Sequence, residues 1–322
     1  MITLEDIRSA QKRIAGVINN TPLVRYMDSS SQCLTYPKPE SFQPIGAFKL
    51  RGAYNKIASL SPTQRAQGVV TFSSGNHAQG VAYAARALGI RAVIVMPSKA
   101  PAIKRTKTLD LGAEIITVED GSEEDWRSTA ETLALEQGLT MVPPFNDETV
   151  IAGQATVGLE IIDDLPDVDM VLVPIGGGGL ISGVAAALKL TQPRIRVVGV
   201  EPEWANDAQA SFRSGKIVEL PLEQTCRTIA DGMRATRIGD ITFEHIQTFV
   251  DDIITVSETE IRKAVRALAL DARLVVEPSG AVPFAAFLYH QNELPSAKKS
   301  VTIISGGNVD PDLLSQILAE RD

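Results

Sequence analysis

Apolar residues follow two patterns along this chain, short continuous runs and longer stretches in which they recur every three or four positions. From residue 68 onward the two patterns alternate, and glycine closes each longer stretch. Strands are therefore predicted at residues 68–72, 92–96 and 114–118, and helices at residues 76–88, 101–111 and 122–137. Repeated strand–helix units of this length indicate a parallel sheet with helices on both faces.

A second alternation follows a helix predicted at residues 150–162. Its strands are predicted at residues 170–175, 195–200, 253–256 and 301–305, and its helices at residues 180–190, 205–214, 258–271, 280–289 and 311–319. Residues 215–240 lack periodicity and are expected to be irregular. The chain is thus predicted to be an α/β protein of two lobes, each an open, mostly parallel sheet flanked by helices. Such sheets bind ligands beyond the carboxyl ends of their strands, here in a cleft between the lobes.

The N-terminal part of the chain is less regular. Residues 4–18 predict an amphipathic helix and residues 49–60 a second helix. Between them, residues 27–45 are read as loop with at most a short edge strand, because Pro37 and Pro39 cannot donate to a central ladder. We predict a small domain at residues 68–147 and a discontinuous large domain made of residues 1–61 and 148–322.

Composition narrows the function classes. The 322 residues are 44% hydrophobic, and the net charge of −8 argues against a nucleic-acid or anionic-membrane surface. No apolar run is long enough to span a membrane, and the N-terminus lacks a secretory pattern, so a cytoplasmic protein is expected. Two distant cysteines and three dispersed histidines form neither a disulfide framework nor a histidine-rich metal site.

Lys49 is the first candidate for chemistry. It follows Phe48 within the segment Gly-Ala-Phe-Lys-Leu-Arg-Gly-Ala. A lysine that is partly desolvated there favours its neutral amine, which is a nucleophile toward carbonyl groups. Taken by itself, a surface lysine at a helix start is the commoner explanation.

Four consecutive glycines follow the predicted strand at residues 170–175 and precede a helix. They are Gly176, Gly177, Gly178 and Gly179. Backbone N–H groups and the helix N-terminus would converge there on an anion, as in a phosphate cradle. The spacing matches neither the dinucleotide fingerprint nor a nucleotide P-loop, so a small monophosphate cofactor is favoured. The alternative is a tight strand–helix turn.

Two more strand ends carry polar side chains. Ser73, Ser74, Asn76 and His77 lie between a strand and a helix, where hydroxyls and free helix N–H groups favour a carboxylate site. An ordinary helix cap is the alternative, and His77 alone is equally compatible with packing. Ser305 ends the last strand, where its hydroxyl could bond a flat ring or belong to a capping turn.

Glu201, Ala205 and Asp207 also follow a strand. Two carboxylates with a backbone carbonyl between them suit a hard cation, although acidic residues in this position are usually solvated.

Together and in this order, these segments resemble the fold-type II pyridoxal-phosphate enzymes, whose fold is that of the tryptophan synthase β subunit. Within them, the chain is most similar to the serine/threonine dehydratase and serine racemase family, from Ile7 to Leu318. The resemblance implies pyridoxal 5′-phosphate as cofactor, an amino-acid substrate and a homodimer. The segments that carry it begin at Thr21, Gly46, Ser73, Val150, Gly176, Ala230, Glu277 and Ser305.

The resemblance also implies roles for single residues. Lys49 corresponds to the Schiff-base lysine that also removes the α-proton, and Phe48 packs beside the cofactor ring. Asn76 is implied to contact the phenolic oxygen of the cofactor, Gly176 to Gly179 its phosphate, and Ser305 its pyridine nitrogen. Glu277 is also implied to lie in the cofactor site. Substrate carboxylate binding is implied for Ser73, Ser74, Asn76 and His77. A divalent cation, Mg²⁺ or Ca²⁺, is implied at Glu201, the backbone oxygen of Ala205, and Asp207.

Two activities of this family remain open from the sequence. The first is elimination of water from a β-hydroxy amino acid, such as L-threonine, L-serine or 3-hydroxyaspartate, to give a 2-oxo acid and ammonia. The second is racemisation, with Ser74 as the proton donor on the face opposite Lys49. Ser74 resembles the racemase branch, whereas Phe145 resembles threonine dehydratases. A non-catalytic binding protein of the same fold is a remote third possibility.

Overall fold

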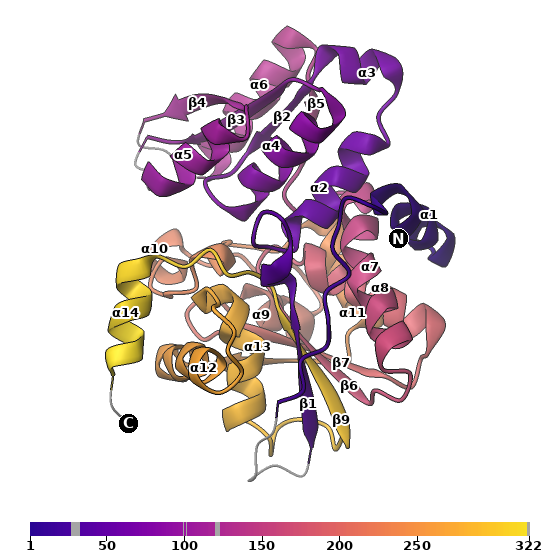
Figure 1. The fold of residues 1–322 in the computed structure, drawn as a ribbon, viewed down its shortest axis with the longest axis vertical. Coiled ribbons are helices and arrows are strands. Elements are labelled where there is room, and N and C mark those ends of the chain that lie inside the picture. Colours follow the sequence, from indigo (N-terminus) through magenta and orange to yellow (C-terminus); the bar gives the residue numbers. More distant parts are fainter. Residues whose placement is uncertain (27–32, 99, 101, 120–122, 321–322) are drawn as a thin grey trace.

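The protein forms two parallel sheets, each covered by helices on both faces (Figure 1). The computed structural model describes residues 1–26, 33–98, 100, 102–119 and 123–320. In spatial order, the larger sheet contains β1 (Leu34–Pro39), β9 (Lys299–Ile304), β6 (Met170–Pro174), β7 (Arg196–Pro202) and β8 (Asp252–Val256). The smaller sheet contains β4 (Glu114–Val118), β3 (Ala92–Pro97), β2 (Val69–Phe72) and β5 (Thr140–Met141). The predicted α/β architecture is confirmed.

The helices fill the segments between the strands. In the first half of the chain they are α1 (Leu4–Ile14), α2 (Lys49–Ala58), α3 (Pro62–Gln67), α4 (Asn76–Leu88), α5 (Ala102–Asp110), α6 (Glu123–Gln137) and α7 (Glu148–Asp164). In the second half they are α8 (Gly179–Thr191), α9 (Asp207–Ser214), α10 (Leu222–Thr225), α11 (Asp240–Phe249), α12 (Glu258–Leu270), α13 (Pro278–Tyr289) and α14 (Pro311–Ala319). No helix in the described part of the chain is long and apolar enough to cross a membrane.

Strand alternation explains how each sheet holds two layers of helices. Successive side chains of a strand point to opposite faces. In β6, Val171 and Val173 pack with apolar residues of α7 and α8. Leu172, between them, packs on the other face with α13 residues such as Phe284. Because both faces are covered, these strands are apolar along their length rather than alternately polar.

The smaller sheet is built in the same way. Val69 of β2 packs with Leu50 of α2 and Ala78 of α4, whereas Val70 packs with Ala130 of α6 on the other face. The helix that begins at Lys49 therefore rests on the smaller sheet, while its neighbour α7 packs on the larger one. This arrangement places the start of α2 between the two sheets (Figure 1).

The edge strand β1 shows how prolines are tolerated in a sheet. β1 pairs with β9 on one side only, and the two lie side by side although they come from opposite ends of the chain (Figure 1). On its other side, the carbonyl of Pro37 accepts a hydrogen bond from Val24 N, so Pro37 faces away from β9. The predicted edge strand is thus present, and six residues long.

Several predicted element bounds differ from the structure. The first helix ends at Ile14 and not at residue 18. Gly16, two residues after this end, adopts a φ of 81°, which a helix does not contain. Helix α11 was not predicted, and α3, α10 and β5 are further short elements that the pattern did not separate from loop. Residues 27–32 of the predicted loop, and the predicted helix starts at residues 101 and 122, lie outside the described residues.

Candidate active site

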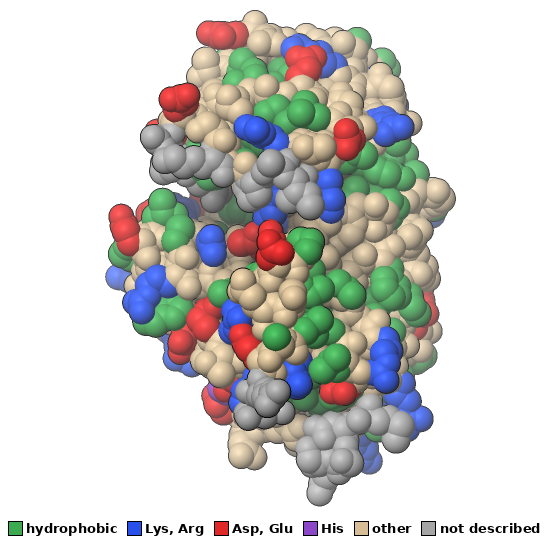
Figure 2. Space-filling model, turned by 60° about the vertical axis from the view of Figure 1, so that its left-hand side comes forward, with side chains coloured by type: hydrophobic (Ala, Val, Ile, Leu, Met, Phe, Trp, Pro, Cys, Tyr) green, Lys and Arg blue, Asp and Glu red, His purple; other side chains and the backbone are tan. Residues whose placement is uncertain are grey.

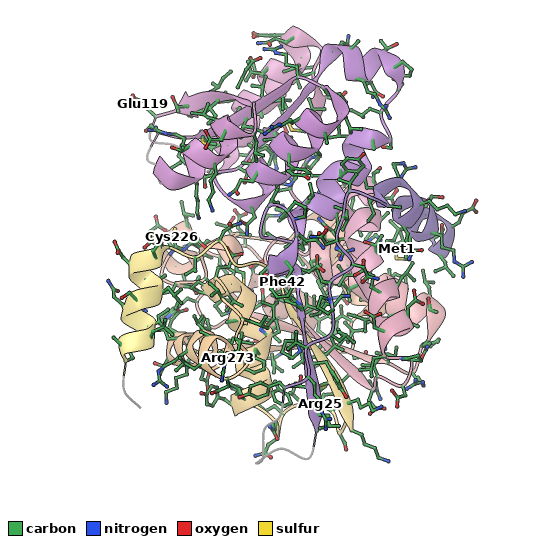
Figure 3. The ribbon with its side chains drawn as sticks, viewed as in Figure 1. Met1, Arg25, Phe42, Glu119, Cys226 and Arg273 are labelled. Atoms are coloured by element: carbon green, nitrogen blue, oxygen red, sulfur yellow. The ribbon has the colours of Figure 1, made fainter. Side chains whose placement is uncertain are left out.

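A cavity of about 460 Å³ lies between the two sheets, at the carboxyl ends of their central strands. Residues that directly follow β2, β6 and β9 line it, as expected for open parallel sheets. The surface is hollowed at this level, between the part that holds the smaller sheet and the part that holds the larger one (Figure 2). Cys226, one of the lining residues, lies on the larger part where it faces the smaller one (Figure 3).

Lys49 enters this cavity from the first turn of α2. The preceding backbone is tied to the last strand, because Phe48 N donates to Ser305 O at 3.0 Å and Ala47 forms a bridge with Gly306. The Lys49 Nζ atom donates to Pro144 O at 2.7 Å and lies 5.3 Å from the centre of the Phe48 ring. The structure thus brings Phe48, Lys49 and Ser305 together at one wall.

The four-glycine turn joins β6 to α8 and lines the same cavity. Gly178 has a φ of 91°, a conformation that other residues rarely adopt. A Cβ atom at Gly177 would lie 2.3 Å from a ring carbon of Phe145. The Thr242 hydroxyl, from α11, donates to Gly177 O at 2.8 Å. Glycine is therefore required here, and the turn presents the free N–H groups at the start of α8 to an anion.

Asn76, at the start of α4, is held by two side chains that lie beside the larger sheet, one just before α13 and one after β9. The Asn308 Nδ2 atom donates to Asn76 Oδ1 at 2.8 Å, and Asn76 Nδ2 donates to Glu277 Oε1 at 2.7 Å. These two bonds fix which way the Asn76 amide points. One hydrogen of Asn76 Nδ2 is left for a ligand, since an amide nitrogen carries two.

Glu277 is a buried carboxyl in this wall. Burial, and then the nearby carboxylate of Asp231, raises the pKa of Glu277 to about 7, while the hydrogen bond from Asn76 opposes the rise. Asp231 in turn forms an ion pair with Lys104 of α5, which links the two sides of the cavity. A carboxyl that titrates near neutrality beside a candidate cofactor site is typical of functional sites.

The serine loop at residues 73–77 lines the cavity from the smaller sheet. The Ser73 hydroxyl accepts a hydrogen bond from Gly75 N at 3.2 Å, and the half-buried Ser74 lines the cavity beside it. His77 is buried and also lines the cavity. Its Nε2 lies 2.9 Å from Val142 O, and because a carbonyl only accepts, Nε2 carries the hydrogen. Burial, and then the charge of Lys49, lowers the pKa of His77 to about 3, so the ring is neutral.

Ser305 and Ser279 contribute hydroxyls from the ends of β9 and the start of α13. The Ser305 hydroxyl lies 3.5 Å from Ser279 O, a long hydrogen bond, so it keeps capacity for another partner. Ser279 accepts from Gly232 N at 2.9 Å. Neither Ser279 nor Asn308 was predicted from the sequence as a site residue, although both lie within the segments that carry the family resemblance.

Glu201 and Asp207 meet at a different place, between β7 and α9, and neither lines the cavity. Both side chains are buried, and Glu201 accepts hydrogen bonds from Ala208 N and Gln209 N at 3.1 and 2.8 Å. Burial raises the pKa of both carboxyls, that of Asp207 to about 7, and for Glu201 the charge of Asp207 adds to the rise. Among the described residues, no group of three or more His, Cys, Asp or Glu side chains could hold a metal.

Comparisons with known proteins agree with this geometry. Residues 14–306 match the family described as pyridoxal-phosphate dependent enzyme. The chain is 45% identical to the L-threonine ammonia-lyase of Thermotoga maritima, over 99% of this chain and 78% of that protein. It is 41% identical to the L-threo-3-hydroxyaspartate ammonia-lyase of Saccharomyces cerevisiae, over 99% and 97% of the two chains. The solved structure of maize serine racemase superimposes with a TM-score of 0.92 at 41% identity, over 97% of this chain and 95% of that one.

Proposed function

Because this chain belongs to the pyridoxal-phosphate dependent enzymes, we propose that it eliminates water from a β-hydroxy amino acid to give a 2-oxo acid and ammonia. The substrate we propose is L-threonine, L-serine or a relative such as 3-hydroxyaspartate. The observation that carries this proposal is the cavity in which Lys49, the glycine turn, Asn76 and Ser305 meet. It also agrees with the activities after which the two ammonia-lyase relatives are named.

The residues of the cavity fit pyridoxal 5′-phosphate. The turn from Gly176 to Gly179, where a Cβ atom would collide with its surroundings, and the start of α8 would hold the phosphate. Asn76 would donate to the phenolic oxygen, and Ser305 would share a hydrogen bond with the ring nitrogen. When bound, the cofactor withdraws electrons from the α-carbon of the amino acid and so acidifies its hydrogen.

Lys49 is the residue we propose for covalent attachment of the cofactor and for removal of the α-proton. Its Nζ atom has a carbonyl acceptor, Pro144 O, that keeps it at the cavity wall. The substrate carboxylate would bind the N–H groups and hydroxyls at Ser73, Ser74 and Asn76. His77 would contribute a neutral ring to this loop, because burial and the charge of Lys49 lower its pKa to about 3.

The test is a 2-oxo acid assay on the purified holoenzyme with L-threonine, L-serine and L-threo-3-hydroxyaspartate, each with and without Mg²⁺. We expect 2-oxo acid from at least one of them. Absence of any 2-oxo acid from the three substrates would exclude the proposed dehydratase.

Racemisation is the second candidate, favoured by Ser74 on the cavity wall and by the close superposition on maize serine racemase. If the enzyme racemises serine, Ser74→Ala should lower that rate by roughly 100-fold or more, because a positioned proton donor contributes about that much. Elimination needs the α-proton removed by Lys49 and a proton for the departing β-hydroxyl, but no donor on the face opposite Lys49, so the kcat for 2-oxo acid should fall far less. Loss of the Ser74 hydroxyl from the carboxylate loop should affect mainly the KM of both reactions. Chiral analysis of residual serine beside the 2-oxo acid assay measures both. Equal losses in the two rates would argue against a separate role for Ser74.

The divalent cation remains a proposal for Glu201, the backbone oxygen of Ala205, and Asp207. The chemistry of this set fits Mg²⁺ or Ca²⁺, because hard cations prefer oxygen ligands. The Asp207 Oδ2 atom is buried without a hydrogen-bond partner among the described residues, and a cation would satisfy it.

The homodimer, the cytoplasmic location and the division into a small domain at residues 68–147 and a large domain from the remaining segments are likewise proposals.

The buried carboxyl of Glu277 leads to a pH prediction for the cofactor-free protein. Its ordinary pKa of 4.5 is raised to about 7, so between these values the folded protein binds more protons than the unfolded chain. The free energy of unfolding must then fall as the pH rises from about 4.5 to 7. Glu277→Gln removes this contribution, which amounts to at most about 3 kcal/mol. Urea unfolding of both proteins at pH 5 and pH 8 measures it, and identical pH slopes would contradict the raised pKa.

A further inference from the structure

The direction of the Asn76 amide decides which of its atoms faces a bound cofactor. Its Nδ2 atom is a donor and suits the phenolic oxygen of pyridoxal phosphate, whereas its Oδ1 atom is an acceptor and would be repelled by that oxygen. The two atoms have nearly the same size, so shape alone does not choose between them. Hydrogen-bond partners of defined polarity have to make the choice.

Asn308 has partners whose roles cannot be exchanged. Its Nδ2 atom donates to the backbone carbonyl of Ile45 at 2.8 Å, and a carbonyl only accepts. Its Oδ1 atom accepts from Lys107 Nζ at 3.3 Å, and an ammonium only donates. The same side chain rests on Gly46, where a Cβ atom would lie 3.0 Å from Asn308 Oδ1. The amide of Asn308 is therefore held in one direction.

This direction is passed on to Asn76. The Nδ2 atom of Asn308 lies 2.8 Å from Asn76, and because it is a donor, the atom that faces it must be the acceptor Oδ1. The Nδ2 atom of Asn76 is thereby turned away from Asn308, toward Glu277 Oε1 at 2.7 Å. Both hydrogens of Asn308 Nδ2 are used, one on Ile45 O and one on Asn76 Oδ1.

Glu277, the other partner of Asn76, has no fixed polarity. Burial, and then the carboxylate of Asp231, raises its pKa to about 7. The hydrogen bond from Asn76, the charge of Lys104 and the backbone N–H of Asn308 oppose this rise. Above its pKa, Glu277 is a carboxylate and accepts from Asn76 Nδ2. Below it, the carboxyl carries a hydrogen and can equally donate to Asn76 Oδ1, with the amide reversed.

We propose that Asn308 is a positioning residue, which keeps the N–H side of the Asn76 amide toward the phenolic oxygen of the cofactor whether or not Glu277 is protonated. Asn308 is not among the residues that line the cavity, so it acts through Asn76. The inference rests on the proposed contact between Asn76 and the phenolic oxygen. Without Asn308, the reversed amide becomes populated when Glu277 is protonated, and it must turn back before the cofactor can accept its hydrogen bond.

The test measures the Kd of pyridoxal phosphate for the cofactor-free wild type and Asn308→Ala at pH 6 and pH 8.5. Dividing the Kd of the variant by that of the wild type cancels the titration of the cofactor itself. We expect this ratio to be about 10 at pH 6, the factor for about one hydrogen bond, and below about 3 at pH 8.5. The analogue 3-deoxypyridoxal phosphate, which lacks the phenolic oxygen, should bind both proteins equally.

Three further variants separate this role from a structural one. Lys107→Met, the matched control, leaves both bonds that Asn308 donates, so its Kd should stay close to that of the wild type at both pH values. Asn308→Asp keeps the size of the side chain, but its carboxylate repels Asn76 Oδ1, so the affinity should also fall at pH 8.5. Adding Glu277→Gln to Asn308→Ala removes the titrating group. Relative to Glu277→Gln alone, the remaining loss should then not change with pH.

The outcomes distinguish the inference from the contact on which it rests. A ratio for Asn308→Ala that is the same at both pH values, or an equal loss for the analogue without the phenolic oxygen, would overturn the role of Asn308. A milder effect of Asn308→Asp than of Asn308→Ala at pH 8.5 would do the same. If Asn76→Ala binds pyridoxal phosphate as tightly as the wild type, the proposed contact of Asn76 fails, and this inference fails with it. The 2-oxo acid assay on the wild type tests the dehydratase separately.

Discussion

Lys49→Ala is expected to lower 2-oxo acid formation by roughly 1,000-fold or more and to remove the absorbance band of protein-bound pyridoxal phosphate. Both effects follow from one amine, since the same Nζ atom is proposed to attach the cofactor and to remove the α-proton. Its place at the cavity wall, with the glycine turn and Ser305, is the structural basis. Absorbance spectra and the 2-oxo acid assay on the purified variant measure the two effects separately.

The matched control is Lys56→Ala on the same helix. Lys56 pairs with Asp147 at 2.6 Å and does not line the cavity, so this variant should keep the absorbance band. Lys104 is the second lysine at the cavity wall. If the absorbance band were lost in Lys104→Ala and kept in Lys49→Ala, Lys104 and not Lys49 would be the lysine that binds the cofactor, and the proposal would be contradicted.

The α/β architecture was predictable because the spacing of apolar residues along the chain distinguishes strands from helices. Apolar runs such as residues 170–175 identified strands, and polar or glycine-rich residues after them identified the edge at which a ligand binds. The family resemblance was confirmed over most of the chain. From its local sequence alone, Lys49 was read as a surface residue. Its catalytic role was predicted only when the motifs at the strand ends were considered together with it.

Other features depend on tertiary contacts that no local pattern encodes. Helix α11 was missed at the end of an irregular region, yet its Thr242 supports the glycine turn. The pairing of Asn308 with Asn76 joins residues that follow strands of the two different sheets, and the buried indole nitrogen of Trp126, which is unpaired within the described part of the chain, depends on what surrounds it in three dimensions. Charge patterning also gave no sign of the fully buried ionic group around Arg51.

Arg51 lies two residues after Lys49 and is completely buried. Its guanidinium bonds Glu40 at 2.7 and 2.8 Å and Glu160 at 2.6 and 2.9 Å, and so ties α2 to the segment after β1 and to α7. Lys38, also fully buried, pairs with Glu160 at 2.8 Å. Burial alone would raise the pKa of Glu40, but the charge and hydrogen bonds of Arg51, together with the charge of Lys38, outweigh it, and the pKa of Glu40 is lowered.

Arg51→Met should therefore lower the free energy of unfolding by about 3–5 kcal/mol, because it leaves the fully buried carboxylate of Glu40 without its main counter-charge. Arg91→Met is the matched control, since Arg91 forms the same two-bonded pair with Glu114 at 2.8 Å, but on the surface. That exposed pair should contribute about 1 kcal/mol or less. Urea unfolding measures both, and equal losses would show that burial of the Arg51 pair has no special weight. Adding Glu40→Gln to Arg51→Met should recover part of the loss, because it removes the unpaired charge, and failure of this rescue would assign the loss to packing instead.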